Sequence, residues 1–178
     1  LEYIKTWADL NVPGLLQEDE EFRSLDDMYP GLVMLCLYEA TGDKQYKKVA
    51  EKIQKTLETY PRTRDGGFYH SVKRTGELWL DGLYMVNVFL AKYGQVLGDE
   101  KNNYKEAIQQ LIINTDKLKD KETGLYYHAY KDTGHREFFD EKTRHSCEFW
   151  GRSIGWTVMA MAEILDIIPE DFPKRDEI

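Results

Sequence analysis

Cysteine and histidine are scarce in this sequence, and their scarcity excludes two kinds of site. The 178 residues contain two cysteines, Cys36 and Cys147, and neither belongs to a Cys-x-x-Cys pair, so neither a zinc site nor a redox motif is indicated. The four histidines include no His-x-His or His-Glu-x-x-His spacing, so we expect no metal ion. Cys36 lies in the apolar run 32–37 and is expected to be a buried small side chain.

Basic patches and long apolar runs are missing as well. Lysine and arginine total 24 against 32 aspartates and glutamates, so the net charge is −8 and no basic stripe is present to neutralise phosphates. No segment reaches the ~20 apolar residues of a transmembrane helix, and none resembles a signal peptide. We therefore expect a cytoplasmic protein that binds neither nucleic acid nor membranes. Because the sequence starts at Leu1 and not at Met, we also expect an internal portion of a longer chain.

Aromatic residues, in contrast, are plentiful. The chain has twelve tyrosines, seven phenylalanines and four tryptophans, and many lie in glycine-containing segments outside the helical patterns. Flat side chains in such loops are candidates for stacking on a ligand. Hydrophobic residues make up 42% of the chain, which is ordinary for a globular protein, and we expect a single domain over residues 1–178.

The first predicted helix is short. Leu1, Ile4, Trp7 and Ala8 recur at a spacing of three to four and share one face. The following Asn-Val-Pro-Gly at 11–14 contains two residues that interrupt helices. We therefore predict a helix over residues 1–10.

A pair of longer helices is predicted next. Ser24 and Asp27 have the spacing of a loose capping box, and the helix should begin near Asp26 or Asp27 and run through Glu39. It is apolar on nearly every side, which predicts burial all round. After a Gly-Asp turn, residues 43–59 have one apolar face and predict an amphipathic helix packed against the first.

This pattern of an apolar helix, a Gly-Asp turn and an amphipathic helix recurs. Residues 81–97 are the second apolar helix, 98–99 the turn and 102–118 the second amphipathic helix. A third apolar helix starts at Arg152 and ends before Pro169. Repeated helix pairs predict an all-α fold of stacked or circularised α/α hairpins.

Closing such pairs into a ring would gather the starts of the apolar helices at one end of the molecule. Charged side chains lie at these starts, and two histidines lie in the loops just before them. A loop histidine is usually structural, but two at matching positions of a repeat suggest a shared pocket. The residues concerned are Asp26, Asp27, His70, Asp81, His128 and Arg152.

Asp81 is the most informative of these residues, because it lies in the apolar stretch 77–85. One interpretation makes its carboxylate only a helix N-cap, which contributes ~0.5–2 kcal/mol. The other makes it a general acid or base in a sugar-binding cleft. A cap needs only one of the adjacent acids Asp26 and Asp27, so the other is free to pair with Asp81, and we favour Asp26.

The stretch Phe-Trp-Gly-Arg-Ser-Ile-Gly-Trp supports a site of this kind. Its glycines allow close backbone approach, and Arg152 can bind a carboxylate through two parallel hydrogen bonds. Trp150 and Trp156 offer flat faces to a sugar ring, as do Trp79 and Tyr84 beside Asp81. The structural alternative is a tight loop whose tryptophans fill the core.

Three stretches together resemble a known family. They are Gly-Gly-Phe-Tyr-His at 66–70, Leu-Trp-Leu-Asp-Gly-Leu-Tyr-Met at 78–85 and Trp-Gly-Arg-Ser-Ile-Gly-Trp at 150–156. In combination they resemble glycoside hydrolase family 105, the unsaturated rhamnogalacturonyl hydrolases, which are related to the family 88 unsaturated glucuronyl hydrolases. The resemblance implies an α/α toroid of the (α/α)6 barrel type, of which this chain would be a partial piece, roughly half.

The resemblance also implies a reaction. Such an enzyme removes a 4,5-unsaturated uronic acid from the non-reducing end of lyase-generated oligosaccharides of the pectin or rhamnogalacturonan type. An acid protonates C4, water adds at C5, and the hemiketal collapses and releases the rest. Asp81 would be the general acid/base and Asp26 the second carboxylate, with no metal or organic cofactor. Substrate contacts are expected from Asp27, His70, Trp79, Tyr84, His128, Trp150, Arg152 and Trp156.

Two alternatives stay open at this point. One is a conventional α/α-barrel glycosidase, in which two carboxylates act at the anomeric carbon. The other is a helical-repeat or carbohydrate-binding fragment without catalysis, which the partial barrel favours.

Overall fold

The computed structural model describes residues 2–19, 21–134 and 136–178. Most of the elements are helices, with a π-helical turn η1 and a final 3-10 turn η2. Helices and turns are α1 (Glu2–Leu15), α2 (Leu25–Met28), α3 (Pro30–Thr41), α4 (Lys44–Thr59), η1 (Leu83–Asn87), α5 (Val88–Leu97), α6 (Glu100–Leu118), α7 (Gly151–Ile167) and η2 (Arg175–Glu177). The all-α prediction is confirmed for the body of the fold.

Two short strands are an addition that the sequence analysis missed. β1 (Glu77–Trp79) pairs antiparallel with β2 (Ala129–Lys131), and Leu78 lies opposite Tyr130. Three-residue strands are too short to show an alternating pattern in the sequence. The pairing joins two loops that lie far apart along the chain.

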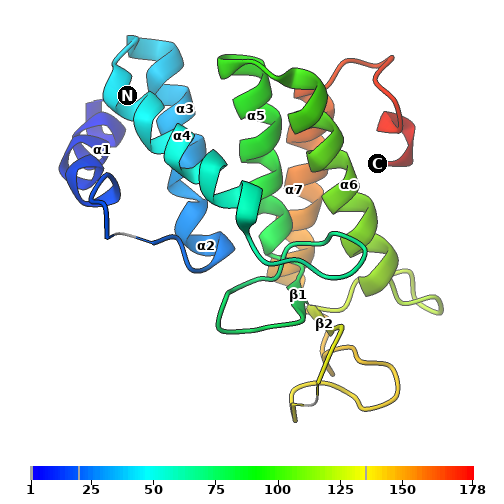
Figure 1. Cartoon of the computed structure of the whole chain (residues 1–178). Helices are drawn as coiled ribbons and strands as arrows, with labels where there is room; N and C mark the ends of the chain where they lie inside the picture. The colour runs from blue at the N-terminus through cyan, green and yellow to red at the C-terminus, as the bar shows by residue number, and fades with distance from the viewer. Residues whose placement is uncertain (1, 20, 135) are drawn as a thin grey trace.

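The helices form two layers, as the repeat predicts (Figure 1). α3, α5 and α7 lie in the inner layer, where α3 packs on α5 and α5 on α7. α4 covers α3 and α6 covers α5, while α1 packs against α3 and α4. The predicted succession of inner apolar and outer amphipathic helices is confirmed for both complete pairs.

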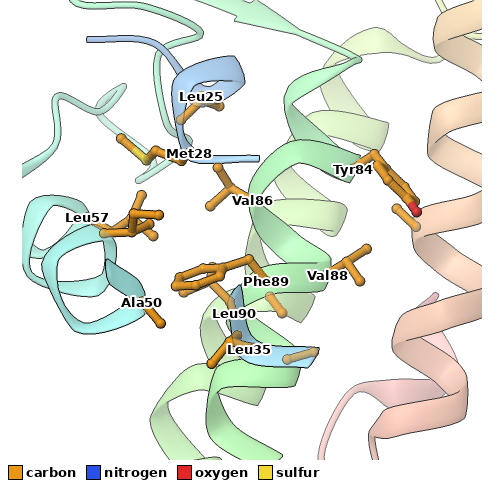
Figure 2. Packing of buried hydrophobic residues seen from close by; sticks show 14 of the residues in the cluster. Leu25, Met28, Leu35, Ala50, Leu57, Tyr84, Val86, Val88, Phe89 and Leu90 are labelled. Carbon is orange, nitrogen blue, oxygen red and sulfur yellow. The ribbon is translucent and has the colours of Figure 1, made fainter. Parts of the chain in front are cut away.

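The core lies between these layers and extends to both sides of the second inner helix. Figure 2 shows Phe89 pointing toward α4, whereas Tyr84 points the opposite way, toward α7. Contact is tight at Gly31, where an added Cβ would lie 2.8 Å from side-chain atoms of Ile53 and Phe89. Apolar positions predicted to face inward from the outer helices are buried, namely Tyr46, Val49, Ala50, Ile53, Leu57, Tyr104, Ala107, Ile108 and Leu111.

The Gly-Asp turns differ in detail. Gly42 has φ 72° and its amide donates to the Tyr38 carbonyl at 2.7 Å, and the Asp43 carboxylate then accepts from the Gln45 amide at 3.0 Å. In the second turn, both residues have positive φ and the helix begins at Glu100. The predicted start at residue 102 was therefore wrong by two residues.

The predicted end of the first helix was wrong. α1 continues through Pro13 to Leu15, although proline removes one backbone donor. Its last turn is held from outside, because the Lys52 ammonium donates to the carbonyls of Leu15 at 3.0 Å and Gln17 at 2.7 Å. Its predicted apolar face is mostly exposed: Ala8 is buried, Ile4 and Trp7 are exposed, and Leu1 lies outside the described residues.

The second helix begins at Leu25 rather than at Asp26 or Asp27, and it is divided at Tyr29 into α2 and α3. The predicted burial all round was also wrong for the first apolar helix, α3. Cys36 is exposed, because α4 and α5 cover two sides of α3 and leave a third open. Val158 and Met159 are likewise exposed on α7, which packs mainly against η1 and α5.

No helix in the described part of the chain is long and apolar enough to span a membrane.

Candidate functional site

The starts of α2, η1 and α7 lie at one end of the molecule, beside β1 and β2 (Figure 1). Backbone hydrogen bonds fasten the histidine loops to these starts. The His70 carbonyl accepts from the Leu25 amide at 2.9 Å, and the His70 amide donates to the Glu77 carbonyl at 2.8 Å. The His128 carbonyl accepts from the Leu80 amide at 2.9 Å, which places this histidine next to Asp81.

Two aspartate–histidine pairs result. Asp26 Oδ2 lies 3.5 Å from His70 Nε2, and Asp81 Oδ2 lies 3.2 Å from His128 Nδ1. Both histidines are buried, but the carboxylates differ: the side chain of Asp26 is 55% exposed and that of Asp81 only 13%. Ser153 Oγ lies 3.3 Å from the same His128 nitrogen. Both carboxylates are thus positioned by an aromatic base from a neighbouring loop.

Trp79 joins the two pairs. Its ring stacks on His70 with centroids 4.6 Å apart and planes 12° apart, and it meets His128 edge-on at 4.8 Å. On the other side of His128 lies Trp150, 4.7 Å away, and the Arg152 guanidinium lies 3.7 Å from the centre of the Trp150 ring. These residues form one continuous aromatic surface around the carboxylates.

Burial changes the proton affinity of the first pair. It raises the pKa of Asp26, and the nearby Asp81 carboxylate adds to that rise. Burial also lowers the pKa of His70 and outweighs the two carboxylates beside it. We infer that His70 is neutral near pH 7 while Asp26 is a stronger base than a free aspartate.

The interpretation of Asp81 as only an N-cap is not supported by the geometry. The amides of Tyr84 and Met85 donate to the backbone carbonyl of Asp81, at 3.1 and 3.4 Å, and not to its carboxylate. Oδ2 is buried and accepts no hydrogen bond from the described residues, since the contact with His128 lacks hydrogen-bond geometry. The following turn is π-helical, a form that is frequent at functional sites. Burying a carboxylate oxygen that accepts no hydrogen bond is energetically costly, which is more typical of a functional group than of a helix cap.

Asp27 has the capping role instead. Its Oδ2 accepts from the amides of Ser24 at 2.8 Å and Arg23 at 2.9 Å, while the Ser24 hydroxyl accepts from the Asp27 amide. This is the capping box that the sequence predicted. The cap directs Asp27 to the backbone and leaves Asp26 to face His70. The structure therefore does not bring Asp27 into the group of candidate residues.

Tyr84 and Trp156 form a separate pair about one helical turn further along η1 and α7. Their rings are 4.7 Å apart, and the Tyr84 hydroxyl donates to Glu163 Oε1 at 2.8 Å. Burial and the Glu163 carboxylate raise the pKa of Tyr84. The structure places these two candidates beside each other. The ring of Tyr29, the residue just before α3, lies with its centre 5.9 Å from the centre of the Tyr84 ring.

Sequence reasoning missed three residues that touch the candidate site. Phe138 lies 6.0 Å from Trp79, Glu77 accepts from the Trp79 indole at 3.0 Å, and Ser153 contacts His128. Ser153 lies inside the Trp-Gly-Arg-Ser motif and had a local signal, but Phe138 comes from an irregular loop with none. Within the described residues, no group of three or more His, Cys, Asp or Glu side chains has an arrangement that would hold a metal ion.

Comparison with known proteins agrees with these features. A family model described as Glycosyl Hydrolase Family 88 matches residues 1–178. The chain belongs to Glycosyl Hydrolase Family 88. Among the curated relatives of this family 88 chain is the unsaturated rhamnogalacturonyl hydrolase YesR of Bacillus subtilis (strain 168), 28% identical over 182 residues. That alignment covers 98% of this chain and 49% of the relative.

Solved structures resemble the family 88 chain over most of its length. A glycoside hydrolase of family 105 from C. acetobutylicum ATCC 824 has a TM-score of 0.83 at 35% identity and covers 86% of this chain and 42% of its own. A possible member of the GH105 family from Salmonella enterica subsp. enterica serovar Paratyphi A str. ATCC 9150 has a TM-score of 0.81 at 26% identity. The match covers 99% of this chain and 45% of that structure's chain. The resemblance to families 105 and 88 and the α/α toroid fold are confirmed, and the chain spans about half the length of these relatives.

Proposed function

We propose that this chain carries the catalytic face of a hydrolase that acts on oligosaccharides ending in a 4,5-unsaturated uronic acid. The observation that supports the proposal best is the pair of carboxylates, Asp26 and Asp81, each beside a buried histidine and joined through Trp79. Family membership and the similarity to an unsaturated rhamnogalacturonyl hydrolase give the substrate class.

In the proposed reaction, Asp81 is the general acid. It delivers its proton to C4 of the unsaturated sugar, and a water oxygen bonds to C5. Asp26 takes the proton that the water loses, a role that fits the raised pKa of its carboxyl group. The resulting hemiketal opens the ring and releases the rest of the oligosaccharide. His70 and His128 orient the two carboxylates.

The substrate is held by aromatic faces and one guanidinium. Trp79 and Trp150 flank the carboxylates and offer apolar surface to the sugar ring. Arg152, stacked on Trp150, binds the carboxylate of the unsaturated uronic acid. Tyr84 is buried against Trp156 and Glu163 and would support the site from beneath rather than contact the sugar. No cofactor takes part in the proposed reaction.

The test follows the ultraviolet absorbance of the conjugated double bond. We expect the full chain to remove this absorbance from a lyase-generated rhamnogalacturonan disaccharide, and Asp81→Asn to abolish the loss. A conventional glycosidase would instead cleave a saturated analogue and leave the absorbance unchanged. A folded chain that binds the disaccharide without turning over either compound would show a carbohydrate-binding fragment and would exclude the proposed reaction.

A further inference from the structure

A cluster of cations lies beside the candidate site and has no role in the proposed reaction. It is built on Glu77, whose side chain is 2% exposed. Arg136 Nη1 lies 2.9 Å from both Glu77 oxygens, Lys131 Nζ lies 3.3 Å from one of them, and Arg74 Nη1 lies 3.8 Å from the other. Three cations therefore surround one carboxylate in a chain whose net charge is −8.

Glu77 stays ionised in this environment. Its burial alone would raise the pKa of its carboxyl group, but hydrogen bonds from the Trp79 indole and Arg136 outweigh burial and lower the pKa. One negative charge then faces three positive charges. Positive charge therefore exceeds negative charge directly around Glu77, although Asp140 and Glu141 line the same hollow as Arg136 and Lys131. The three cations lie next to the ring that joins the two aspartate–histidine pairs.

Arg74 in particular is only weakly paired with Glu77. Its contact is long, and its guanidinium instead lies over the Trp79 ring, 4.6 Å from the ring centre. Its side chain is 38% exposed, and that of Arg136 is 42% exposed. Each guanidinium has five N–H donors in a planar fork, so both retain donors that face the solvent. Arg136 also lies 5.6 Å from the Phe138 ring.

The two arginines are presented by loops that fit closely together. Gly76 has φ 79°, and an added Cβ there would lie 2.4 Å from Thr133 Oγ1. The Asp132 amide donates to the Gly76 carbonyl at 2.6 Å, and Lys131 Nζ donates to the Thr75 carbonyl at 3.3 Å. These bonds hold the two loops side by side, so the cationic surface is preformed.

The position of Arg74 over the Trp79 ring, which also stacks on His70, places it at the rim of the site. Its charge acts to lower the pKa of both Asp26 and His70, against the larger effect of burial on Asp26. Because Arg74 and His70 both lie against Trp79, a ligand that covers the first aspartate–histidine pair lies beside the Arg74 guanidinium.

We infer that Arg74 and Arg136, held by Glu77, form a binding site for a carboxylate of an acidic oligosaccharide, separate from the uronic acid that the candidate active site would hold. The inference rests on the proposed function for the position of the sugar chain. It deepens that function: substrates with a second uronic acid would bind more tightly than neutral ones of equal length. Planar bidentate binding of carboxylates by arginine supplies the chemistry.

The test measures binding and does not depend on turnover. Tryptophan fluorescence would be titrated with saturated trigalacturonate and with an uncharged trisaccharide, using the full chain. We expect Arg74→Gln and Arg136→Gln each to raise the Kd for trigalacturonate about tenfold, as expected for one lost charged hydrogen bond, and not to affect the uncharged sugar. Arg64→Gln, which removes an exposed arginine from another loop, is the matched control.

Each outcome decides the inference. Equal binding of the acidic and uncharged sugars, or an equal loss in Arg64→Gln, would overturn it. If Arg136→Gln unfolds, Arg74→Gln decides alone, because Arg74 is half exposed and makes only a long ion pair with Glu77 besides its contact with the Trp79 ring. Binding that depends on the two arginines, without loss of ultraviolet absorbance, would support the inference and exclude the proposed function. Turnover without such binding would support the proposed function and overturn the inference.

Discussion

Asp27 and Asp81 show how the surroundings of a carboxylate decide its role. Both lie beside a helix start, but two backbone amides donate to the Asp27 carboxylate, whereas the buried Oδ2 of Asp81 accepts from no donor among the described residues. Asp27→Ala should therefore lower the free energy of unfolding by about 1 kcal/mol, as the loss of a cap does. Chemical denaturation of the variant and the wild type measures this difference.

Asp81→Asn should affect turnover rather than stability. We expect turnover to fall by roughly 10²–10⁴-fold, which is the usual contribution of a general acid, with little change in unfolding free energy. Kinetic assay and denaturation of the same preparation separate the two effects. A variant that unfolds readily but retains its turnover would restore the capping interpretation and remove Asp81 from catalysis.

His70 should make stability depend on pH. Because burial lowers its pKa in the folded state, the unfolded chain binds the proton more readily. The stability that follows from a neutral His70 is therefore present above its ordinary pKa of about 6.5 and is lost as the pH falls through the folded value. The slope is at most about 1.4 kcal/mol per pH unit. Urea denaturation of wild type and His70→Asn across this range should show a shallower slope for the variant.

At the scale of the helix, replacing two different glycines by alanine should change stability in opposite directions. In α3, Gly31 faces Ile53 and Phe89 with no room for a methyl group, whereas nothing lies within 4 Å of a Cβ added at Gly155 in α7. Gly31→Ala should destabilise the protein by about 1–3 kcal/mol through overpacking. Gly155→Ala should be neutral or stabilising, by up to about 1 kcal/mol, because alanine favours the helix. Thermal unfolding of both variants tests whether the α3–α5 contact is as close in solution.

At the scale of the whole molecule, α7 has one buried and one open side. Ile164 is fully buried, but Val158 is 60% exposed. Ile164→Ala should cost about 2–5 kcal/mol of unfolding free energy. Val158→Ser should change it by no more than about 0.5 kcal/mol, as for other surface positions. A large loss in Val158→Ser, measured in the same denaturation series, would mean that another surface covers α7 in solution.

That a single domain spans residues 1–178 and is part of a larger barrel stays a prediction. The chain matches a family model over its full length but covers only 49% of a curated relative. Both facts agree with the interpretation of a partial barrel, and the sequence of the whole gene would test it.

Local patterns in the sequence predict most of the helices, together with their order and their pairing. Apolar spacing within α4 and α6 is local, and the positions that it predicts to face inward are buried. The Ser24–Asp27 capping box and the Gly42–Asp43 turn are also local, since each depends on residues a few positions apart. The caps and turns can be predicted because they depend on interactions between near neighbours, and the helices because their apolar residues recur at a spacing that places them on one face.

The arrangement of the candidate site depends on contacts between distant parts of the chain. The Glu77–Arg136 ion pair joins residues 59 positions apart, and the Tyr84–Glu163 hydrogen bond joins residues 79 positions apart. Packing also left Asp81 without a capping bond. These contacts form when loops and helix starts meet at one end of the fold, so no local pattern of residues encodes them.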